Sequence, residues 1–208
     1  MARYVGPKCR LCRREGTKLF LKGERCFTPK CAVTKRETLP GMHTWRHGKP
    51  SQYAAQLREK QKVKRYYGMR ERPFRRLFHE AERMPGHTGE ALVVMLERRL
   101  DNVLYLAGFA NSRASARQMV CHGLVSVGGH RVDVPSYLVA QDDVIRPKNN
   151  EKTLKLVKSN LELTKGREVP AWIQVTEEPP AIVIRALPGR DEISVETREQ
   201  MIVELLSK

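Results

Sequence analysis

The residues best suited to chemistry in this sequence are four cysteines near its start, arranged as C-x2-C-x13-C-x4-C. They are Cys9, Cys12, Cys26 and Cys31. A C-x2-C pair on a tight turn holds two sulfurs within reach of one ion, and a second pair completes a four-coordinate site. Four thiolates suit zinc or an iron–sulfur cluster. We therefore expect one zinc ion at these cysteines, with a 4Fe–4S cluster at the same four as the alternative.

A different grouping of ligands has the spacing C-x4-C-x11-H-x3-H, and it consists of Cys26, Cys31, His43 and His47. Such a finger needs a helix that carries both histidines, and the Leu39-Pro40-Gly41 stretch interrupts a helix just before them. It would also leave the first cysteine pair without a role. The four-cysteine site is therefore favoured over the mixed site and over a segment without metal.

The fifth cysteine, Cys121, stands in the stretch QMVCHG, which has the pattern of an apolar helix. Most cysteines in such a setting are small core residues. We expect Cys121 to be one of them.

Positive charge is concentrated in the first half of the chain. The 208 residues include 39 Lys and Arg against 23 Asp and Glu, a net charge of +16. Residues 1–100 hold 25 basic and 9 acidic residues, whereas residues 101–208 hold 14 of each. A polyanion is the partner that explains such a distribution most simply. The cysteine segment alone contributes seven basic residues that a metal-held knuckle would display outward: Arg10, Arg13, Arg14, Lys18, Lys22, Arg25 and Lys30.

A membrane partner is a weaker explanation of this charge. The longest apolar run, Ala91–Leu96, has six residues, far short of the ~20 that a spanning helix needs. Because no apolar stretch follows Met1, we expect no signal peptide and a cytoplasmic location. Thiols are kept reduced there, which favours metal binding over disulfides.

Motifs of catalysis do not appear in the sequence. It contains no G-x-S-x-G, H-E-x-x-H or G-x-G-x-x-G pattern. His122 and His130 flank a turn, where they are either surface residues or contacts to phosphate or ribose.

Helical patterns dominate residues 51–107. Ser51 is a suitable N-cap for a helix over 51–67; its polar face carries Arg58, Lys60, Lys62, Lys64 and Arg65. A second helix begins near Pro73, with an apolar stripe at Phe74, Leu77, Phe78 and Ala81. A third runs on from Thr88 with one buried face, namely Leu92, Leu96, Leu100, Val103 and Ala107.

Residues 98–150 have the pattern of a compact α+β module. A short helix capped by Ser112 precedes a hairpin, whose Gly128-Gly129 pair supplies the positive φ angles of a type I′ turn. A helix over 153–164, strands at WIQVTE and AIVIRAL, and a last helix capped by Ser194 complete the chain. Residues 1–48 are expected to be irregular, with short strands at most.

The stretch RLDNVLYLAGFANSRASARQMVCHGLVSVGGHRVDVPSY resembles the alpha-L RNA-binding motif, a helix-turn-helix-like pair followed by a hairpin. Together with the cysteine segment and the basic helices, it makes the whole chain, residues 1–208, resemble the family of bacterial small-subunit ribosomal protein number four. Two positions depart from that pattern: Gly128 stands where the family commonly has Asn, and Cys121 where it commonly has a basic residue. Many members lack the four cysteines.

The resemblance implies an α+β fold with a projecting alpha-L module, made of short helices and a small antiparallel sheet. The expected parts are a metal knuckle and basic extension (1–48), a helical body (49–97), the alpha-L module (98–164), and a C-terminal segment (165–208) that packs back on the helical body. Two alternative functions remain open. An RNA-modifying enzyme would need a catalytic domain, and a zinc-dependent transcriptional regulator would need a recognition helix or a dimerisation element.

The resemblance also implies a function in the ribosome, with no enzymatic activity. Such a protein binds small-subunit ribosomal RNA early, nucleates assembly of the subunit body, and contributes to translational accuracy with a neighbour, ribosomal protein number five. It lies near the channel by which messenger RNA enters. The expected RNA contacts are Arg10, Arg13, Arg14, Lys22, Arg58, Lys62, Arg65, Arg72, Arg75, Arg76, Ser112, Arg113, Arg117, His122 and Arg131.

Overall fold

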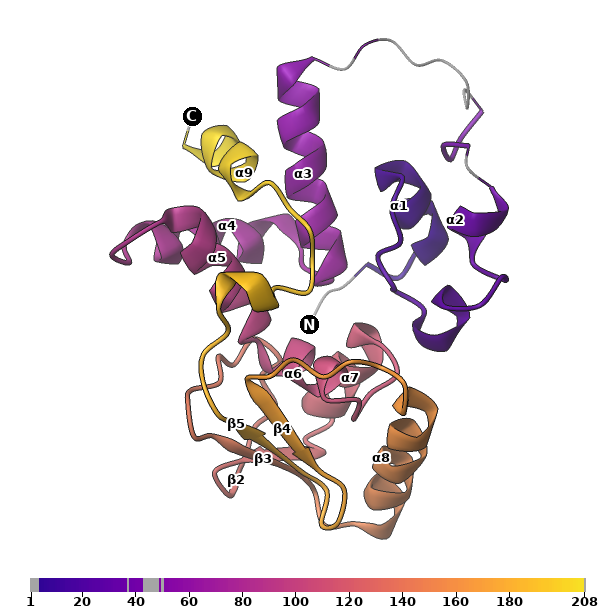
Figure 1. The fold of residues 1–208 in the computed structure, drawn as a ribbon, viewed down its shortest axis with the longest axis vertical. Helices are drawn as coiled ribbons and strands as arrows, with labels where there is room; N and C mark the ends of the chain where they lie inside the picture. Colours follow the sequence, from indigo (N-terminus) through magenta and orange to yellow (C-terminus); the bar gives the residue numbers. More distant parts are fainter. Residues whose placement is uncertain (1–3, 37, 43–48, 50, 208) are drawn as a thin grey trace. The chain divides into compact units, whose positions relative to one another are not determined.

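A computed structural model describes residues 4–36, 38–42, 49 and 51–207. The chain divides into two compact units. The first unit is Met1–Val93 with Val195–Lys208, and the second is Val94–Ser194. Helices build the first unit, and helices with one antiparallel sheet build the second, so the expected α+β class is confirmed (Figure 1). Within the described residues, no helix is both long and apolar enough to span a bilayer.

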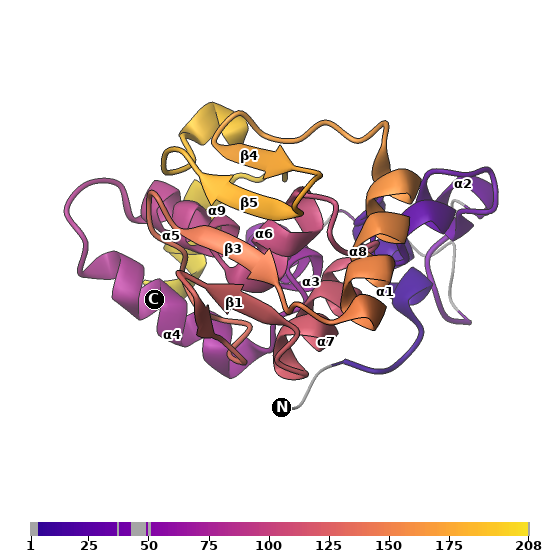
Figure 2. The same ribbon diagram turned by 90° about the horizontal axis from the view of Figure 1, so that it is seen from below.

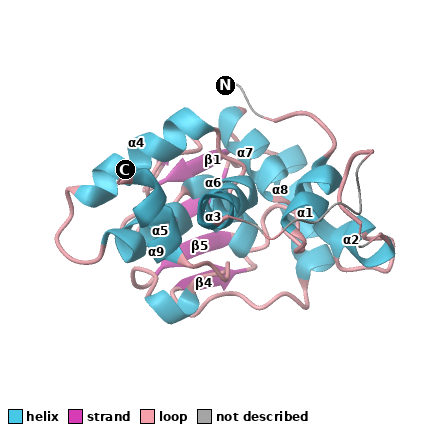
Figure 3. Ribbon diagram, turned by 90° about the horizontal axis from the view of Figure 1, so that it is seen from above, coloured by secondary structure: helices cyan, strands magenta, loops and turns pink. Residues whose placement is uncertain are grey.

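The cysteine segment is more helical than expected. It contains α1 (Lys8–Glu15), a 3-10 turn η1 (Gly23–Cys26) and α2 (Ala32–Lys35), where short strands at most were expected (Figure 3). Arg13, which is also predicted to contact RNA, donates hydrogen bonds to the carbonyls of Thr38 (2.9 Å) and Leu39 (3.1 Å). The side chain thus ties α1 to the chain that follows α2.

The helix expected over 51–67 is confirmed as α3 (Gln52–Tyr66). The hydroxyl of Ser51 caps it by accepting a hydrogen bond from the N–H of Ala54 at 3.2 Å. The last helix, α9 (Glu199–Leu206), lies beside α3, and Gln56 donates to the carboxylate of Glu204 at 2.8 Å (Figure 1). The predicted cap at Ser194 was wrong, because α9 begins five residues later and Ser194 bonds elsewhere.

The apolar stripe of the second predicted helix is confirmed in α4 (Glu71–Glu82). Phe74, Leu77, Phe78 and Ala81 are all buried. Burial of a large apolar side chain stabilises the fold by roughly 1.5–3 kcal/mol. The stripe therefore anchors α4 and leaves its arginines on the opposite, exposed face.

One lysine expected on the polar face of α3 is buried. Lys60 has 5% of its surface exposed, and its ammonium contacts the carboxylate of Glu71 at 2.5 Å. Lys64 (2.9 Å) and Arg75 (3.2 Å) contact the same carboxylate. The aliphatic stem of Lys60 can pack among apolar groups while its charge is neutralised, so this cation serves the junction of α3 and α4.

The third predicted helix is divided into α5 (Thr88–Glu97) and α6 (Leu100–Leu106). The backbone is extended at Arg99, which forms an isolated bridge with Leu138. The N–H of Leu100 donates to the carbonyl of Tyr137 at 2.8 Å. These bonds to a distant loop replace helical hydrogen bonds and divide the helix. Apolar periodicity does not reveal them, and it therefore predicts one continuous helix.

The motif at the centre of the second unit follows the sequence pattern. Helix α7 (Arg113–Cys121) is capped by Ser112, whose hydroxyl accepts from the N–H of Ser115 at 3.3 Å. Strands β1 (Val125–Val127) and β2 (His130–Arg131) form the hairpin. Both residues of the turn, Gly128 and Gly129, have positive φ, as a type I′ turn requires.

The C-terminal segment does not pack back as one piece. Strands β3 (Val144–Pro147), β4 (Ile173–Thr176) and β5 (Ala181–Ile184) complete a sheet of order β2-β1-β3-β5-β4 (Figure 2). The expected boundary at 164/165 therefore differs from the structure, where residues up to Ser194, including the 3-10 turn η2 (Arg190–Glu192), belong to the second unit. The reason is that β5 pairs with β3, which extends the sheet of the alpha-L module.

A single apolar cluster fixes the sheet against its helices. It joins Leu104 of α6, Val120 of α7 and Val157 of α8 (Glu151–Thr164) to Ile145 and Ile182 of the sheet. Trp172, at the start of β4, is also buried there. The cluster gives the second unit a rigid frame on which polar side chains can be held.

Replacing Glu71 should show how much this carboxylate contributes to the stability of the first unit. Glu71→Gln should destabilise it by about 1 kcal/mol at neutral pH, a modest figure because water screens a side chain that is 37% exposed. Partial burial raises the pKa of Glu71, but Lys60, Lys64 and Arg75 outweigh that effect and lower it to about 2 from 4.5. A lowered pKa in the folded state gives stability that is full above about pH 4.5 and is lost as the pH falls toward about 2.

Urea unfolding at about pH 7 and about pH 3 measures this difference. The gap between wild type and Glu71→Gln should shrink at the lower pH. Glu80→Gln is the matched control, since Glu80 pairs with an Arg76 side chain that is 84% exposed and should cost little. An equal penalty for Glu71→Gln at both pH values would show that shape, not charge, is what matters.

Candidate functional site

The four cysteines of the N-terminal segment line one pocket. Cys9 and Cys12 lie on α1, Cys26 ends η1, and Cys31 caps α2. The first pair is held by a helix rather than by the tight turn that was expected, yet i and i+3 positions share a helix face. The alternative ligands His43 and His47 lie outside the described residues. In the described part of the chain, no group of three or more His, Cys, Asp or Glu side chains is assembled closely enough to hold a metal ion.

The thiols of this pocket differ in their surroundings. Burial raises the pKa of Cys12 and Cys26, and charges on the other thiols would raise it further. The N–H of Lys22 donates to the sulfur of Cys26 at 3.3 Å. Burial would also raise the pKa of Cys31, but the N–H groups of Val33 and Thr34 together with Lys18 lower it. Backbone N–H groups directed at sulfur favour the thiolate, which is the form that binds metal.

A buried carboxylate connects the cysteine segment to α3. The Glu15 side chain is 1% exposed and forms ion pairs with Arg65 and, at 3.4 Å, with Arg58. Burial raises the pKa of Glu15, and the two arginines oppose that effect. Arg58 and Arg65, both expected to contact RNA, therefore also hold α1 against α3.

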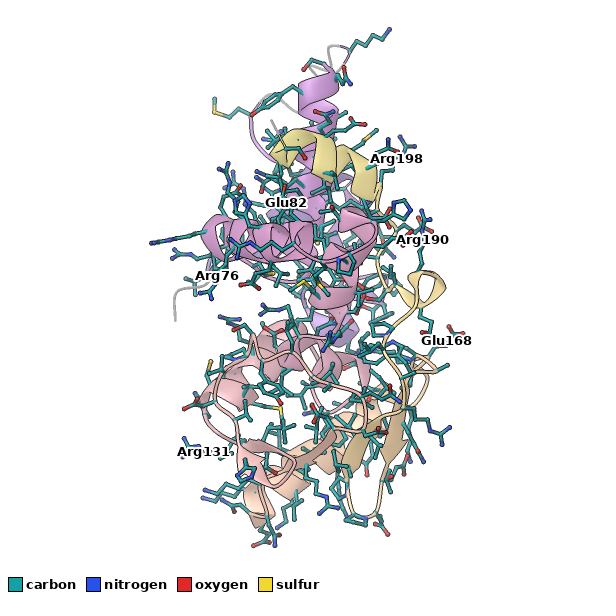
Figure 4. The ribbon with its side chains drawn as sticks, turned by 90° about the vertical axis from the view of Figure 1, so that its left-hand side faces the viewer. Arg76, Glu82, Arg131, Glu168, Arg190 and Arg198 are labelled. Carbon is teal, nitrogen blue, oxygen red and sulfur yellow. The ribbon has the colours of Figure 1, made fainter. Side chains whose placement is uncertain are left out.

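The remaining basic residues expected at an RNA surface lie on the outside of the first unit. Arg10, Arg14 and Lys22 are exposed on the cysteine segment. Arg72, Arg75 and Arg76 are exposed on α4, and Figure 4 shows Arg76 extending away from the helix. Lys62 is half-buried, 3.5 Å from Glu59. Such a set of cations on rigid helices can bind phosphate groups without reading sequence.

One residue that the resemblance to the alpha-L motif predicts as an RNA contact is buried. Arg113 is 7% exposed, donates to the side-chain oxygen of Asn102 at 2.8 Å, and lies over the ring of Tyr105 at 4.3 Å. Its role as an RNA contact stays a prediction, which this burial does not favour. Arg113 instead fixes the start of α7 against α6.

Behind α7 lies a network of buried charges. Arg99 donates two hydrogen bonds to Asp101 (3.0 and 2.7 Å), and Arg117 contacts the same carboxylate at 3.1 Å. Asn102 donates to Glu97 at 2.5 Å, and Glu97 also accepts from the N–H of Ser194 at 3.0 Å. These positioning residues were not predicted from the sequence, although Asp101-Asn102, which interrupts the apolar run of α6, was a signal for them.

The outer face of the motif carries the other expected contacts. His122 and Arg131 are exposed, and Figure 4 shows Arg131 at the surface of the second unit. A Cβ at Gly123 would lie 2.3 Å from Nε of Arg131, so a glycine is needed for this guanidinium to lie over the end of α7. Cys121 is exposed as well, and its prediction as a core residue was wrong because it lies on the outer face of α7.

Comparisons with known proteins agree with this arrangement. A family profile described as "Ribosomal protein S4/S9 N-terminal domain" matches residues 3–97, and one described as "S4 domain" matches residues 98–145. Proteins named small ribosomal subunit protein uS4 match over 100% of both chains. They come from Thermoanaerobacter sp. (50% identical) and Thermus thermophilus (48%), and a uS4A comes from Symbiobacterium thermophilum (52%).

Two arginine substitutions should distinguish a residue that stabilises the second unit from one that contacts RNA. Arg113→Met should lower the free energy of unfolding by about 2 kcal/mol, because Asn102 loses a buried, charged donor. Arg131→Met should change it by less than about 0.5 kcal/mol, yet weaken binding to RNA. Urea unfolding and RNA filter binding on both variants check this. A stable Arg113→Met variant with weakened RNA binding would contradict it.

Proposed function

Since the chain belongs to the uS4 family of small ribosomal subunit proteins, we propose that it holds small-subunit ribosomal RNA through the exposed cations described above. The observation that carries this proposal is the roughly 50% identity over the entire chain, 100% of its length and of its relatives' length. The side chains that agree with it are Arg10, Arg14, Lys22, Arg72, Arg75, Arg76, His122 and Arg131, all of them exposed.

Members of this family are structural, non-enzymatic constituents of the ribosome that bind ribosomal RNA. In bacteria such a protein resides in the cytoplasmic ribosome. The family assignment favours neither the RNA-modifying enzyme nor the transcriptional regulator, because the relatives that match are named as small ribosomal subunit proteins.

We also propose a place for the protein in the assembled subunit. It binds naked ribosomal RNA early and nucleates the subunit body, and it later contacts ribosomal protein number five and the messenger where it enters. Support comes from the charge: residues 1–100 carry the whole excess of +16, which favours direct contact with the phosphates of RNA. The arginines of α4 and the hairpin residue Arg131 offer phosphate contacts from both units.

We propose further that Cys9, Cys12, Cys26 and Cys31 bind one zinc ion, with a 4Fe–4S cluster as the alternative. Support comes from the four thiols, which line one pocket, and from the N–H of Lys22, which donates to the sulfur of Cys26, although the described side chains are not assembled as a ligand group. When bound, the metal supplies a cross-link among four thiolates. The protein's own part is to bring three short helical segments together and to place Lys22 and Arg25 beside the thiols.

Salt dependence tests the electrostatic proposal. The affinity for ribosomal RNA should fall steeply with salt, by roughly 0.7–0.9 logarithmic units per phosphate neutralised for each tenfold increase. Arg72→Ala should weaken binding and reduce that slope by about one unit. Lys155→Ala is the control, because Lys155 pairs with Glu151 at 2.6 Å on α8 and is not one of the predicted contacts. A slope near zero for the wild type would overturn the proposal.

Elemental mass spectrometry on protein purified without oxygen tests the metal. The expected result is about one zinc per chain without colour, whereas several irons with sulfide and a brown spectrum would mean a cluster. Cys26→Ser should lose the metal, and Cys121→Ser, which changes an exposed thiol outside the pocket, should keep it. Wild-type protein without either metal would remove the metal proposal and leave RNA binding untouched.

A further inference from the structure

Two phenylalanines of the cysteine segment form a stacked pair at its surface. The ring centroids of Phe20 and Phe27 lie 4.8 Å apart, with 28° between the ring planes. Phe27 is 57% exposed, although it is among the largest apolar side chains in the segment. An aromatic pair gains most when it is buried, so packing alone does not account for a ring left so open to water.

The backbone around this pair holds the rings in place. Phe20 has φ of 50°, in the left-handed region that a bulky residue rarely adopts. Its neighbours turn inward, since Leu19 is 1% exposed and Leu21 lines the thiol pocket. Phe27 directly follows Cys26, and its N–H closes η1 on the carbonyl of Glu24 at 2.9 Å. A strained backbone that is retained in a structure indicates a site where the conformation has a use.

The charge around the rings identifies their partner. Residues 17–36 hold six basic residues and one acidic residue. Lys18, Lys22, Arg25 and Lys30 are all exposed. Aromatic rings set among cations are the combination by which proteins bind unpaired nucleotides, because the rings stack on bases and the cations neutralise phosphates. An apolar protein surface would gain from the rings but not from this excess of positive charge.

We propose that Phe27, supported from behind by Phe20, stacks on an unpaired base of the bound ribosomal RNA. This inference rests on the proposed function and adds a contact of a different kind to it. The cations of the chain bind phosphates without regard to base pairing. A stacking ring selects a nucleotide that is free of a duplex, so it would direct the cysteine segment to a loop, bulge or junction.

Affinity for small-subunit ribosomal RNA, measured for full-length variants at several salt concentrations, tests the proposal. Phe27→Ala should weaken binding by about 5- to 150-fold, the range for loss of one stacked base. The salt slope should stay unchanged, because no charge is removed. Phe27→Trp should bind with about the affinity of the wild type, because tryptophan keeps an aromatic ring. Phe27→Leu should bind as weakly as Phe27→Ala, since leucine keeps an apolar group but lacks a ring face. Arg25→Ala, by contrast, should reduce the slope by about one unit.

Leu163→Ala controls for the loss of an exposed apolar side chain elsewhere, as Leu163 is 55% exposed on α8. It should bind like the wild type. Ultraviolet cross-linking of the wild-type complex, followed by peptide mass spectrometry, gives a second measurement that needs no variant. A nucleotide adduct on Phe27 or Phe20 is the expected result, and adducts confined to other segments would overturn the proposal.

The other outcomes are equally decisive. Wild-type affinity in Phe27→Ala, with or without a loss of binding to a neighbouring ribosomal protein, would overturn stacking and leave the proposed function intact. Full affinity in Phe27→Leu would mean an apolar contact rather than base stacking, which also overturns it. Failure of the wild type to bind the RNA at any salt would instead overturn the proposed function.

Discussion

Charge neutralisation by a few carboxylates is the constraint on which both units depend. The chain carries a net charge of +16, and self-repulsion of that size opposes a compact state. Three carboxylates each collect two or more cations: Glu15 pairs with two arginines, Glu71 with two lysines and an arginine, and Asp101 with two arginines. Each cluster lies where elements meet. The basic residues are thereby divided into a group that holds the fold and a group left at the surface.

That division could not be predicted from the sequence. Residue type and clustering identified a basic first half and a family of RNA-binding proteins. They did not distinguish Arg72, which is exposed, from Arg113, which is buried against Asn102 and Tyr105. Whether an arginine faces water or a carboxylate depends on what another segment brings next to it. Such contacts join residues far apart in the chain, and local patterns do not specify them.

The fold follows the same rule. Features set by neighbouring residues were predicted: the Ser51 and Ser112 caps, the apolar stripe of α4 and the turn at Gly128-Gly129. Features set by distant partners were not. Pairing of β5 with β3 moves residues up to Ser194 into the second unit, and the bridge between Arg99 and Leu138 divides one apolar run into two helices. In both cases backbone hydrogen bonds to remote segments overrode local periodicity.

The cysteine segment must also offset the repulsion among its cations, and it has few carboxylates and few buried apolar side chains with which to do so. Its described residues include few buried apolar side chains, chiefly Leu19, and its acidic residues are scarce against its cations. The pocket of four thiols, the Glu15 ion pairs and the hydrogen bonds of Arg13 are therefore among the interactions that hold it together. Binding of phosphates would neutralise the cations that no carboxylate reaches, and a ligand that binds only the folded state stabilises it. Folding of this segment and binding of RNA would therefore reinforce each other, because the charges that oppose the first drive the second.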